Sequence, residues 1–181
     1  LKYVVRSRLT KRVKKTNKYF SWITAKKDSG ITKVKHLRGK SFAFTNTSSS
    51  SGYLYPQAYF KLHGLVPKKF FSQIVFAGTH QKLTKMIAQG RVEAGASRDM
   101  NLWNAEKKYG RIFRRIKKIG PILNPSFAAN DQVDDALCKQ FIFALEHIPS
   151  GVMRRKLVYT GFRRIPETKF NAVAKLLNAM H

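Results

Sequence analysis

Acidic residues and cysteines are scarce in this sequence. Of 181 residues only 9 are Asp or Glu, against 36 Lys or Arg, which gives a formal net charge of +27. The single cysteine, Cys138, excludes a disulfide within the chain. Its neighbours in ALCKQFIFAL favour a small buried side chain over a reactive thiol. A chain this basic attracts anions, so nucleic acids and acidic membrane surfaces have to be weighed as partners.

Long apolar runs are also missing. No run approaches the roughly 18–20 residues that a membrane-spanning helix needs, so we expect no transmembrane segment. No stretch resembles a signal peptide, and the sequence begins at Leu1 rather than at methionine. We therefore expect it to be part of a longer or processed product. Hydrophobic residues make up 43% of the chain, which is enough to build a buried core.

Catalytic and metal-binding motifs are absent as well. The five histidines are scattered, with no H-E-x-x-H spacing. The serine run at 48–51 lies outside any G-x-S-x-G elbow and has no evident base and orienting acid beside it. The G-x-x-x-x-G-K-[ST] pattern of a nucleotide-binding loop is not present either. We expect no enzymatic activity, no metal and no cofactor.

What the sequence does contain is an alternation of strand and helix patterns, which predicts an α/β fold with a largely parallel sheet. Strands are expected at 19–25, 41–44, 71–78, 91–96 and within 111–122, the last stopped by Gly120 and Pro121. Helices are expected at 31–39, 52–64, 80–89, 102–110, 131–148 and 167–180.

Two of these helices carry apolar stripes, and one has a capping signal. The helix at 131–148 places Val133, Leu137, Phe141, Leu145 and Ile148 on one face, which predicts that this face is buried. The helix at 167–180 does the same with Phe170, Val173, Ala174 and Leu177. Thr79 is expected to cap the helix at 80–89, and Gly90 to end it.

Ligands of open α/β sheets bind outside the carboxyl ends of the strands, so we look for function at the strand-to-helix junctions. The junctions at 45–52, 77–80 and 97–101 are rich in small hydrogen-bonding side chains. The first junction contains the serine run followed by Gly52. Free amides at the start of a helix, together with serine hydroxyls, suit a phosphate-like anion. Serine also favours helix starts as a simple cap, and the residues alone leave both interpretations open.

Five segments, in this order, resemble motifs of the phosphonate/phosphite/phosphate-binding periplasmic proteins of ABC transporters. They are KDSG (27–30), LRGK (37–40), SSSGYL (49–54), FAGTH (76–80) and QGRVEAGA (89–96). The segment YTGFRRIPETKFNAVAKLL also resembles the end of that family's chains. The resemblance implies a type II periplasmic-binding fold with two hinged lobes that close over a small oxyanion.

The resemblance also implies a division of the chain into three parts. Residues 1–26 would be the crossing strand and hinge segment from the first lobe, and residues 27–119 the second lobe. Residues 120–181 would be the return hinge and the C-terminal helices of the first lobe. The family's first half-lobe has no counterpart before Leu1.

By resemblance, Ser49, Ser50, Ser51 and Gly52 correspond to the family's phosphonate-gripping loop, and His80 to its ligand-facing histidine. Asn46, Asp99 and Asn124 complete the set of candidate ligand-binding residues. The family carries carboxylates near the last two positions, where they can bind an amine on the ligand. Here Asp99 is shifted by one position, and the hinge offers Asn124 instead of an acid. This favours a simple phosphate-like anion over an aminoalkyl phosphonate.

The resemblance thus implies a periplasmic solute-binding protein that captures phosphonate, phosphite or phosphate and delivers it to ABC permease subunits. An extracytoplasmic sensing domain of a signalling protein is the alternative, because it would use the same site. A basic nucleic-acid-binding protein is less favoured, since the chain has no recognisable recognition helix, zinc site or aromatic RNA platform.

Overall fold

The computed structural model describes residues 4–11, 13–16, 18–149, 151 and 159–178. The chain divides into two compact units. One consists of Phe20–Ile122 with Leu176–His181, and the other of Leu1–Tyr19 with Leu123–Lys175. The boundaries expected at 26/27 and 119/120 from the family resemblance stay a prediction.

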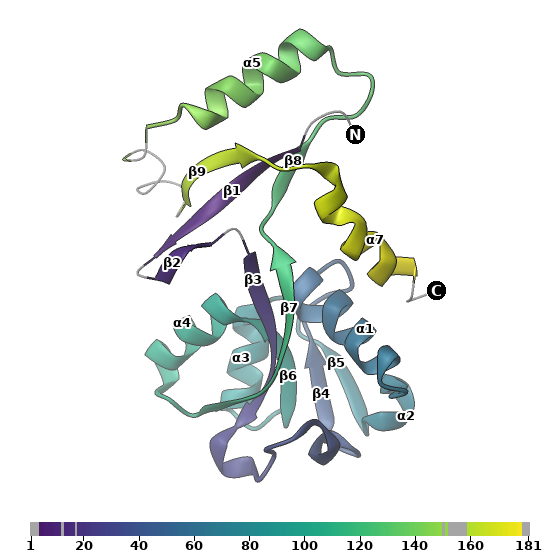
Figure 1. Cartoon of the computed structure of the whole chain (residues 1–181). Helices are drawn as coiled ribbons and strands as arrows, with labels where there is room; N and C mark the ends of the chain where they lie inside the picture. Colours follow the sequence, from purple (N-terminus) through teal and green to yellow (C-terminus); the bar gives the residue numbers. More distant parts are fainter. Residues whose placement is uncertain (1–3, 12, 17, 150, 152–158, 179–181) are drawn as a thin grey trace. The chain divides into compact units, whose positions relative to one another are not determined.

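The unit that contains Phe20–Ile122 is built on a five-stranded sheet of order β5-β4-β6-β3-β7 (Figure 1). β4 pairs in parallel with both β5 and β6, whereas β3 runs antiparallel to β6. The α/β class is confirmed, but the sheet is mixed rather than largely parallel. The strands are β3 (Lys18–Lys26), β4 (Ser41–Phe44), β5 (Gln73–Phe76), β6 (Ala94–Arg98) and β7 (Phe113–Leu123).

Helices cover both faces of this sheet (Figure 1). The chain moves outward from β4 to β5 and then back past β4 to β6, so right-handed crossovers place the two connections on opposite faces. α1 (Tyr55–Leu62) and α2 (Pro67–Phe70) lie on one side, and α3 (His80–Ala88) and α4 (Asp99–Tyr109) on the other. The shorter helices are η1 (Lys27–Ser29), η2 (Val34–Leu37) and the π-helix η3 (Ser50–Leu54), which leads directly into α1.

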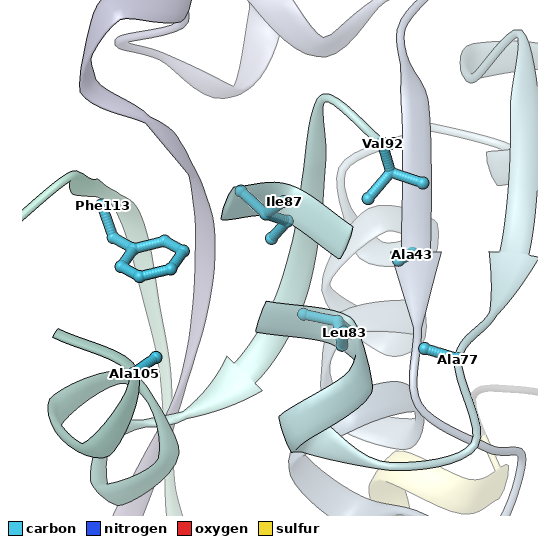
Figure 2. Packing of buried hydrophobic residues seen from close by; sticks show 7 residues of the cluster. All are labelled: Ala43, Ala77, Leu83, Ile87, Val92, Ala105 and Phe113. Carbon is cyan, nitrogen blue, oxygen red and sulfur yellow. The ribbon is translucent and has the colours of Figure 1, made fainter. Parts of the chain in front are cut away.

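Successive side chains of β4 point to opposite faces of the sheet, so this strand contributes to the hydrophobic core on both faces. Phe42 and Phe44 point to one side and join an aromatic cluster in which the rings of Phe42 and Phe71 stack at 4.4 Å. Ala43 points to the other side, where α3 and α4 pack (Figure 2). The small Ala43 lets those helices approach. The cluster on that side consists of Ala43, Ala77, Leu83, Ile87, Val92, Ala105 and Phe113.

The other unit holds a second, antiparallel sheet centred on β1 (Val4–Lys11). β1 pairs with β2 (Val13–Thr16), β8 (Ser126–Ala128) and β9 (Tyr159–Arg164). The helical elements described after β8 are α5 (Asp135–Glu146), η4 (Glu167–Phe170) and α7 (Asn171–Asn178). A crossing strand was expected within residues 1–26, where β1 and β2 lie, but β8 and β9 were not expected, because short sequences without a clear alternation give little strand signal.

Three of the expected strands have wrong limits. The strand expected at 71–78 is the shorter β5 at Gln73–Phe76. The strand expected at 91–96 is β6 at Ala94–Arg98, since its pairing with β4 begins only at Ala94. β7 does not stop at Gly120 and Pro121 but continues to Leu123. As the last strand of the sheet, β7 lies at an edge, where a proline without an amide hydrogen is tolerated.

The apolar stripe expected on the helix at 131–148 was wrong in part, since Leu145 and Ile148 pack as expected but Leu137 and Phe141 do not. α5 starts at Asp135 and buries Cys138, Ile142 and Leu145, while Leu137 and Phe141 are 57% and 47% exposed. The helix is apolar on two sides, and the periodicity alone does not say which side packs against β9. The burial expected for Cys138 is confirmed, at 4% exposure. Ala174 is exposed, against expectation, and Phe170 and Val173 are half-buried.

Candidate functional site

Three strand-to-helix junctions meet at one edge of the five-stranded sheet. Because β4, β5 and β6 run parallel, their carboxyl ends share this edge, and η3–α1, α3 and α4 begin there. Hydrogen bonds join the junctions. The Asn46 side-chain amide donates to the Gly78 carbonyl at 3.0 Å, and His80 Nδ1 lies 3.0 Å from the Ser97 hydroxyl. The structure therefore brings the candidates of all three junctions to one edge.

Of the four backbone amides of residues 49–52, two have an acceptor among the described residues and two do not. Ser49 is the N-cap, and its hydroxyl accepts a hydrogen bond from the Gly52 amide at 3.0 Å. The Ser49 amide in turn donates to the Asn46 carbonyl at 3.2 Å. Among the described residues, no acceptor is found for the amides of Ser50 and Ser51. These two amides, at the positive end of a helix, are the donors that an anion could use.

Buried hydrogen bonds from β3 and from the end of β4 hold the serine loop in place. Ser21 on β3 donates its hydroxyl hydrogen bond to the Ser51 carbonyl at 2.6 Å, and the Thr45 amide donates to the Gly52 carbonyl at 3.2 Å. A side chain at Gly52 would overlap the Thr45 hydroxyl. Ser51 and Thr45 are 2% and 1% exposed. These buried contacts support the conformation of the serine loop, as a preorganised binding site requires.

His80 is held in its neutral form. Burial, together with the smaller effect of the positive charge of Arg98, lowers the pKa of His80 to about 4. The Ser97 hydroxyl beside its Nδ1 is fully buried. When that hydroxyl donates to Nδ1, the neutral ring carries its proton on Nε2. His80 can then offer one N–H to an anion at neutral pH without itself being charged.

Asp99 and Asn124 fit the expected site less directly. Asp99 is the first residue of α4, and one of its carboxylate oxygens accepts a hydrogen bond from the Met100 amide at 2.8 Å. Asn124 is 2% exposed and belongs to the other unit, where its carbonyl accepts from the Ser126 hydroxyl at 3.3 Å. Contact of either residue with a ligand stays a prediction, as it does for Asn46, Ser49–Ser51, Gly52 and His80.

Sequence reasoning missed Ser21, which supports this edge, and it placed Ser97 and Arg98 in the junction at 97–101 without making them candidate ligand-binding residues. Ser21 and Ser97 are polar residues in otherwise apolar strands, and both are fully buried. That interruption of an apolar run was the available signal. It could not be used without knowing that β3 pairs antiparallel with β6, where Ser21 lies opposite Arg98 and Trp22 opposite Ser97.

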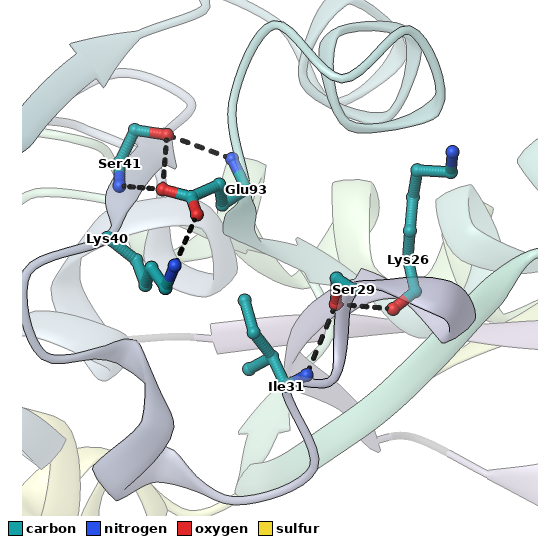
Figure 3. A network of polar contacts seen from close by, with 6 residues as sticks. All are labelled: Lys26, Ser29, Ile31, Lys40, Ser41 and Glu93. Carbon is teal, nitrogen blue, oxygen red and sulfur yellow. Dashed lines mark hydrogen bonds and ion pairs between the residues drawn. The ribbon is translucent and has the colours of Figure 1, made fainter.

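Some of the recognised motifs build structure at the other end of β4 (Figure 3). Glu93 accepts a hydrogen bond from the Ser41 amide at 2.9 Å and pairs with Lys40 at 2.9 Å. Partial burial alone would raise the pKa of Glu93, but its hydrogen bonds with Lys40 and Ser41 and the charge of Lys40 outweigh burial and lower it. Likewise, the Ser29 hydroxyl donates to the Lys26 carbonyl at 2.7 Å and closes the turn of the KDSG segment.

Within the described part of the chain, no cluster of three or more His, Cys, Asp or Glu side chains could hold a metal ion. In the same part, no helix is both long enough and apolar enough to cross a bilayer.

Several solved structures share this fold. A Xanthomonas citri protein bound to ATP matches with a TM-score of 0.78 at 19% identity, over 98% of this chain and 71% of that one. A binding-protein component of an ABC phosphonate transporter from Pseudomonas aeruginosa matches with a TM-score of 0.78 at 18% identity, over 97% of this chain and 62% of that one. PhnD1 from Prochlorococcus marinus, in complex with methylphosphonate, matches with a TM-score of 0.74 at 15% identity, over 96% and 72%.

These likenesses establish the fold, and they show that the chain spans between 62% and 72% of the length of these three structures. The family itself is established by a sequence model. The model described as "ABC transporter, phosphonate, periplasmic substrate-binding protein" matches residues 5–165, which is most of the chain. The chain belongs to the family of phosphonate-binding periplasmic substrate-binding proteins of ABC transporters.

Proposed function

We propose that this protein captures a small phosphorus oxyanion, such as phosphonate, phosphite or phosphate, in the periplasm and delivers it to the permease subunits of an ABC importer. The observation that carries the proposal is the pair of free amides at Ser50 and Ser51. They lie at a helix start on the edge where three helices begin. The junctions around them contain a single acid, Asp99.

The chemistry of this edge suits a tetrahedral oxyanion. Two backbone N–H groups, the hydroxyls of the serine loop and the neutral His80 ring are all hydrogen-bond donors. Methylphosphonate in the Prochlorococcus protein and ATP in the Xanthomonas protein both present phosphorus oxyanions. These two ligands support phosphorus oxyanions as the class of ligand, and they do not favour one particular phosphorus oxyanion. No described feature favours the sensing-domain alternative over transport.

Isothermal titration calorimetry of the purified chain with phosphate, phosphite and methylphosphonate tests the proposal. We expect saturable binding of one ligand per chain by at least one of the three. Sulfate, another tetrahedral dianion, is the control for selectivity toward phosphorus. An absence of binding by all three would refute the proposed function.

A pair of variants at Ser50 tests whether the amide is the donor. Ser50→Pro removes the N–H, and proline fits the first position of a helix. The preceding residue Ser49, at φ −77° and ψ 117°, already has the extended conformation that a following proline requires. Ser50→Ala removes only the hydroxyl. We expect the proline variant to weaken binding about tenfold or more, the value of one hydrogen bond to a charged group. The alanine variant should lose less than about threefold.

The two variants should unfold at similar temperatures, which circular dichroism checks. Equal losses of affinity in both variants would assign the interaction to the hydroxyl and contradict the role of the amide.

A further inference from the structure

The His80 side chain is hydrogen-bonded to Ser97, a residue just after the last recognised motif, QGRVEAGA. His80 is the first residue of α3, and its Nδ1 lies 3.0 Å from the hydroxyl of Ser97 on β6, which α3 contacts. Ser97 is fully buried, and in the described part of the chain its hydroxyl has a hydrogen-bond partner only in His80. The contact therefore joins the start of α3 to the end of β6.

The number of hydrogens available decides which of the two groups donates. A serine hydroxyl has one hydrogen, and a neutral imidazole has one on a single ring nitrogen. If Nδ1 donated to the hydroxyl, the hydroxyl hydrogen of Ser97 would be buried without an acceptor among the described residues, which costs free energy. If Ser97 donates instead, both groups are satisfied, and the ring hydrogen of His80 is on Nε2.

The other nitrogen of the ring is open. Nε2 of His80 makes no hydrogen bond to a described residue, and it is not among the unpaired polar atoms that are buried. The half-buried ring lies at the edge where η3, α3 and α4 begin. Because burial, with a smaller effect of the Arg98 charge, lowers the pKa of His80 to about 4, the ring is neutral at neutral pH. Its tautomer then decides what Nε2 presents.

The tautomer changes the sign of the interaction with an oxyanion. With its hydrogen on Nε2, the ring donates a hydrogen bond to an anionic oxygen. With the hydrogen on Nδ1, Nε2 presents a lone pair, which repels that oxygen. The tautomer thus determines whether His80 adds a donor to the amides of Ser50 and Ser51 or opposes them.

We propose that Ser97 is a positioning residue, which donates its hydroxyl hydrogen to Nδ1 and fixes His80 in the tautomer that offers Nε2–H to a phosphorus oxyanion. This inference rests on the proposed function, in which His80 contacts the ligand. Ser97 itself is fully buried, so it acts through the His80 ring and not by touching the ligand.

NMR of the histidine ring nitrogens in the chain without ligand tests the tautomer directly, because a protonated nitrogen and one with a lone pair have distinct chemical shifts. At about pH 7.5 we expect a neutral His80 with its hydrogen on Nε2. His80→Ala identifies the signals by removing them. A hydrogen on Nδ1, or an equal mixture of the two tautomers, would overturn the inference before any ligand is added.

Variants of Ser97 test whether its hydroxyl is responsible. We expect Ser97→Ala to populate the second tautomer and to bind methylphosphonate at least about threefold more weakly in calorimetry. Ser97→Thr keeps the hydroxyl and should keep both the tautomer and, within about twofold, the affinity. In a His80→Ala background, Ser97→Ala should change the affinity by less than about twofold, because the ring through which Ser97 acts is absent. An equal loss in both backgrounds would assign Ser97 a general structural role and contradict the inference.

Thr24→Val is the matched control. Thr24 on β3 is fully buried like Ser97, but its hydroxyl donates to the Arg114 carbonyl at 2.8 Å. Valine keeps the size of the side chain, so the change removes one buried hydrogen bond that does not involve His80. We expect an unchanged His80 tautomer and an affinity within about twofold of the unmodified chain. The same shift of tautomer as in Ser97→Ala would show that the effect is not specific to Ser97.

The outcomes separate the two proposals. If the unmodified chain binds methylphosphonate but Ser97→Ala leaves both tautomer and affinity unchanged, the inference about Ser97 is wrong and the proposed function stands. If the unmodified chain binds none of phosphate, phosphite and methylphosphonate, the proposed function is wrong, and the ligand role of His80 with it, whatever its tautomer. Should Ser97→Ala fail to fold, the tautomer of the unmodified chain and the threonine variant still decide the matter.

Discussion

The serine loop depends on a residue without a side chain. A Cβ atom at Gly52 would overlap the hydroxyl of Thr45 and lie 2.7 Å from its Cγ2. Thr45 is a β-branched residue that is 1% exposed, so it has little room to move. The conformation that leaves the amides of Ser50 and Ser51 free therefore requires glycine at this position.

We expect Gly52→Ala to reduce the free energy of unfolding by about 2 kcal/mol, the usual cost of overpacking a core. Thr45→Ala should relieve the overlap, so the double variant should be more stable than the sum of the single changes by about 1 kcal/mol or more. Urea unfolding of the four proteins measures this coupling. Strictly additive effects would show that the two residues do not meet.

The neutral state of His80 makes a prediction about pH. Its folded pKa of about 4 lies below the ordinary value of 6.5, so between these values the unfolded chain binds a proton that the folded chain does not. The contribution of His80 to stability is complete above pH 6.5 and decreases as the pH falls toward about 4. We expect His80→Asn to remove this decrease from the pH profile of the unfolding temperature.

Replacement of the exposed His36 is the control and should leave the profile unchanged. An NMR titration of the His80 ring measures the folded pKa directly. A midpoint near 6.5 would contradict the assignment of a neutral, desolvated imidazole.

At the scale of elements, the recognised motifs divide into two roles. The SSSGYL and FAGTH segments form the edge at which helices start. The LRGK and VEA segments meet at the other end of β4, where Glu93 joins Lys40 to the Ser41 amide. This connection sets where β4 and β6 begin, and so it positions their carboxyl ends as well. The LRGK and VEA motifs therefore stabilise the fold, whereas the SSSGYL and FAGTH motifs form the edge that we propose binds the ligand.

We expect Glu93→Gln to destabilise the fold by about 1 kcal/mol, since it removes the ion pair and weakens the hydrogen bond to the Ser41 amide. The estimate is modest because the Lys40 and Glu93 side chains are 43% and 40% exposed. Chemical unfolding at neutral pH measures the change. Asp28→Asn breaks the more exposed pair with Lys26 and should cost less than about 0.5 kcal/mol, which makes it the control. Equal effects of both changes would show that the Glu93 network is only a surface ion pair.

At the scale of the whole molecule, the excess of positive charge supports anion capture without requiring nucleic acid. A net charge of +27 attracts anions of any kind and raises their rate of encounter. Under the proposed function, selection among anions would come from the local geometry at Ser50, Ser51 and His80. The long-range field and the local site therefore act at different steps of binding, and only the local site distinguishes one ligand from another.

The sequence by itself determined the α/β class, the order of most elements in residues 18–122 and the three strand-to-helix junctions that meet at one edge of the sheet. The strand at 41–44, the existence of a strand within 71–78, the Thr79 cap and the serine loop could all be predicted because each depends on residues close together in the chain. Local hydrogen bonding and apolar periodicity decide such features.

Only the tertiary structure decided which amides of the serine loop are free and which charges surround them. The pairing of Ser21 with Arg98 joins residues 77 positions apart by their numbering, and the antiparallel β3–β6 register that creates it has no signal in either segment alone. The exposed Leu137 and Phe141 show the same limit, because periodicity identifies an apolar face but not the surface that will cover it. Burial and field strength depend on contacts between distant segments, so they appear only once the chain has folded.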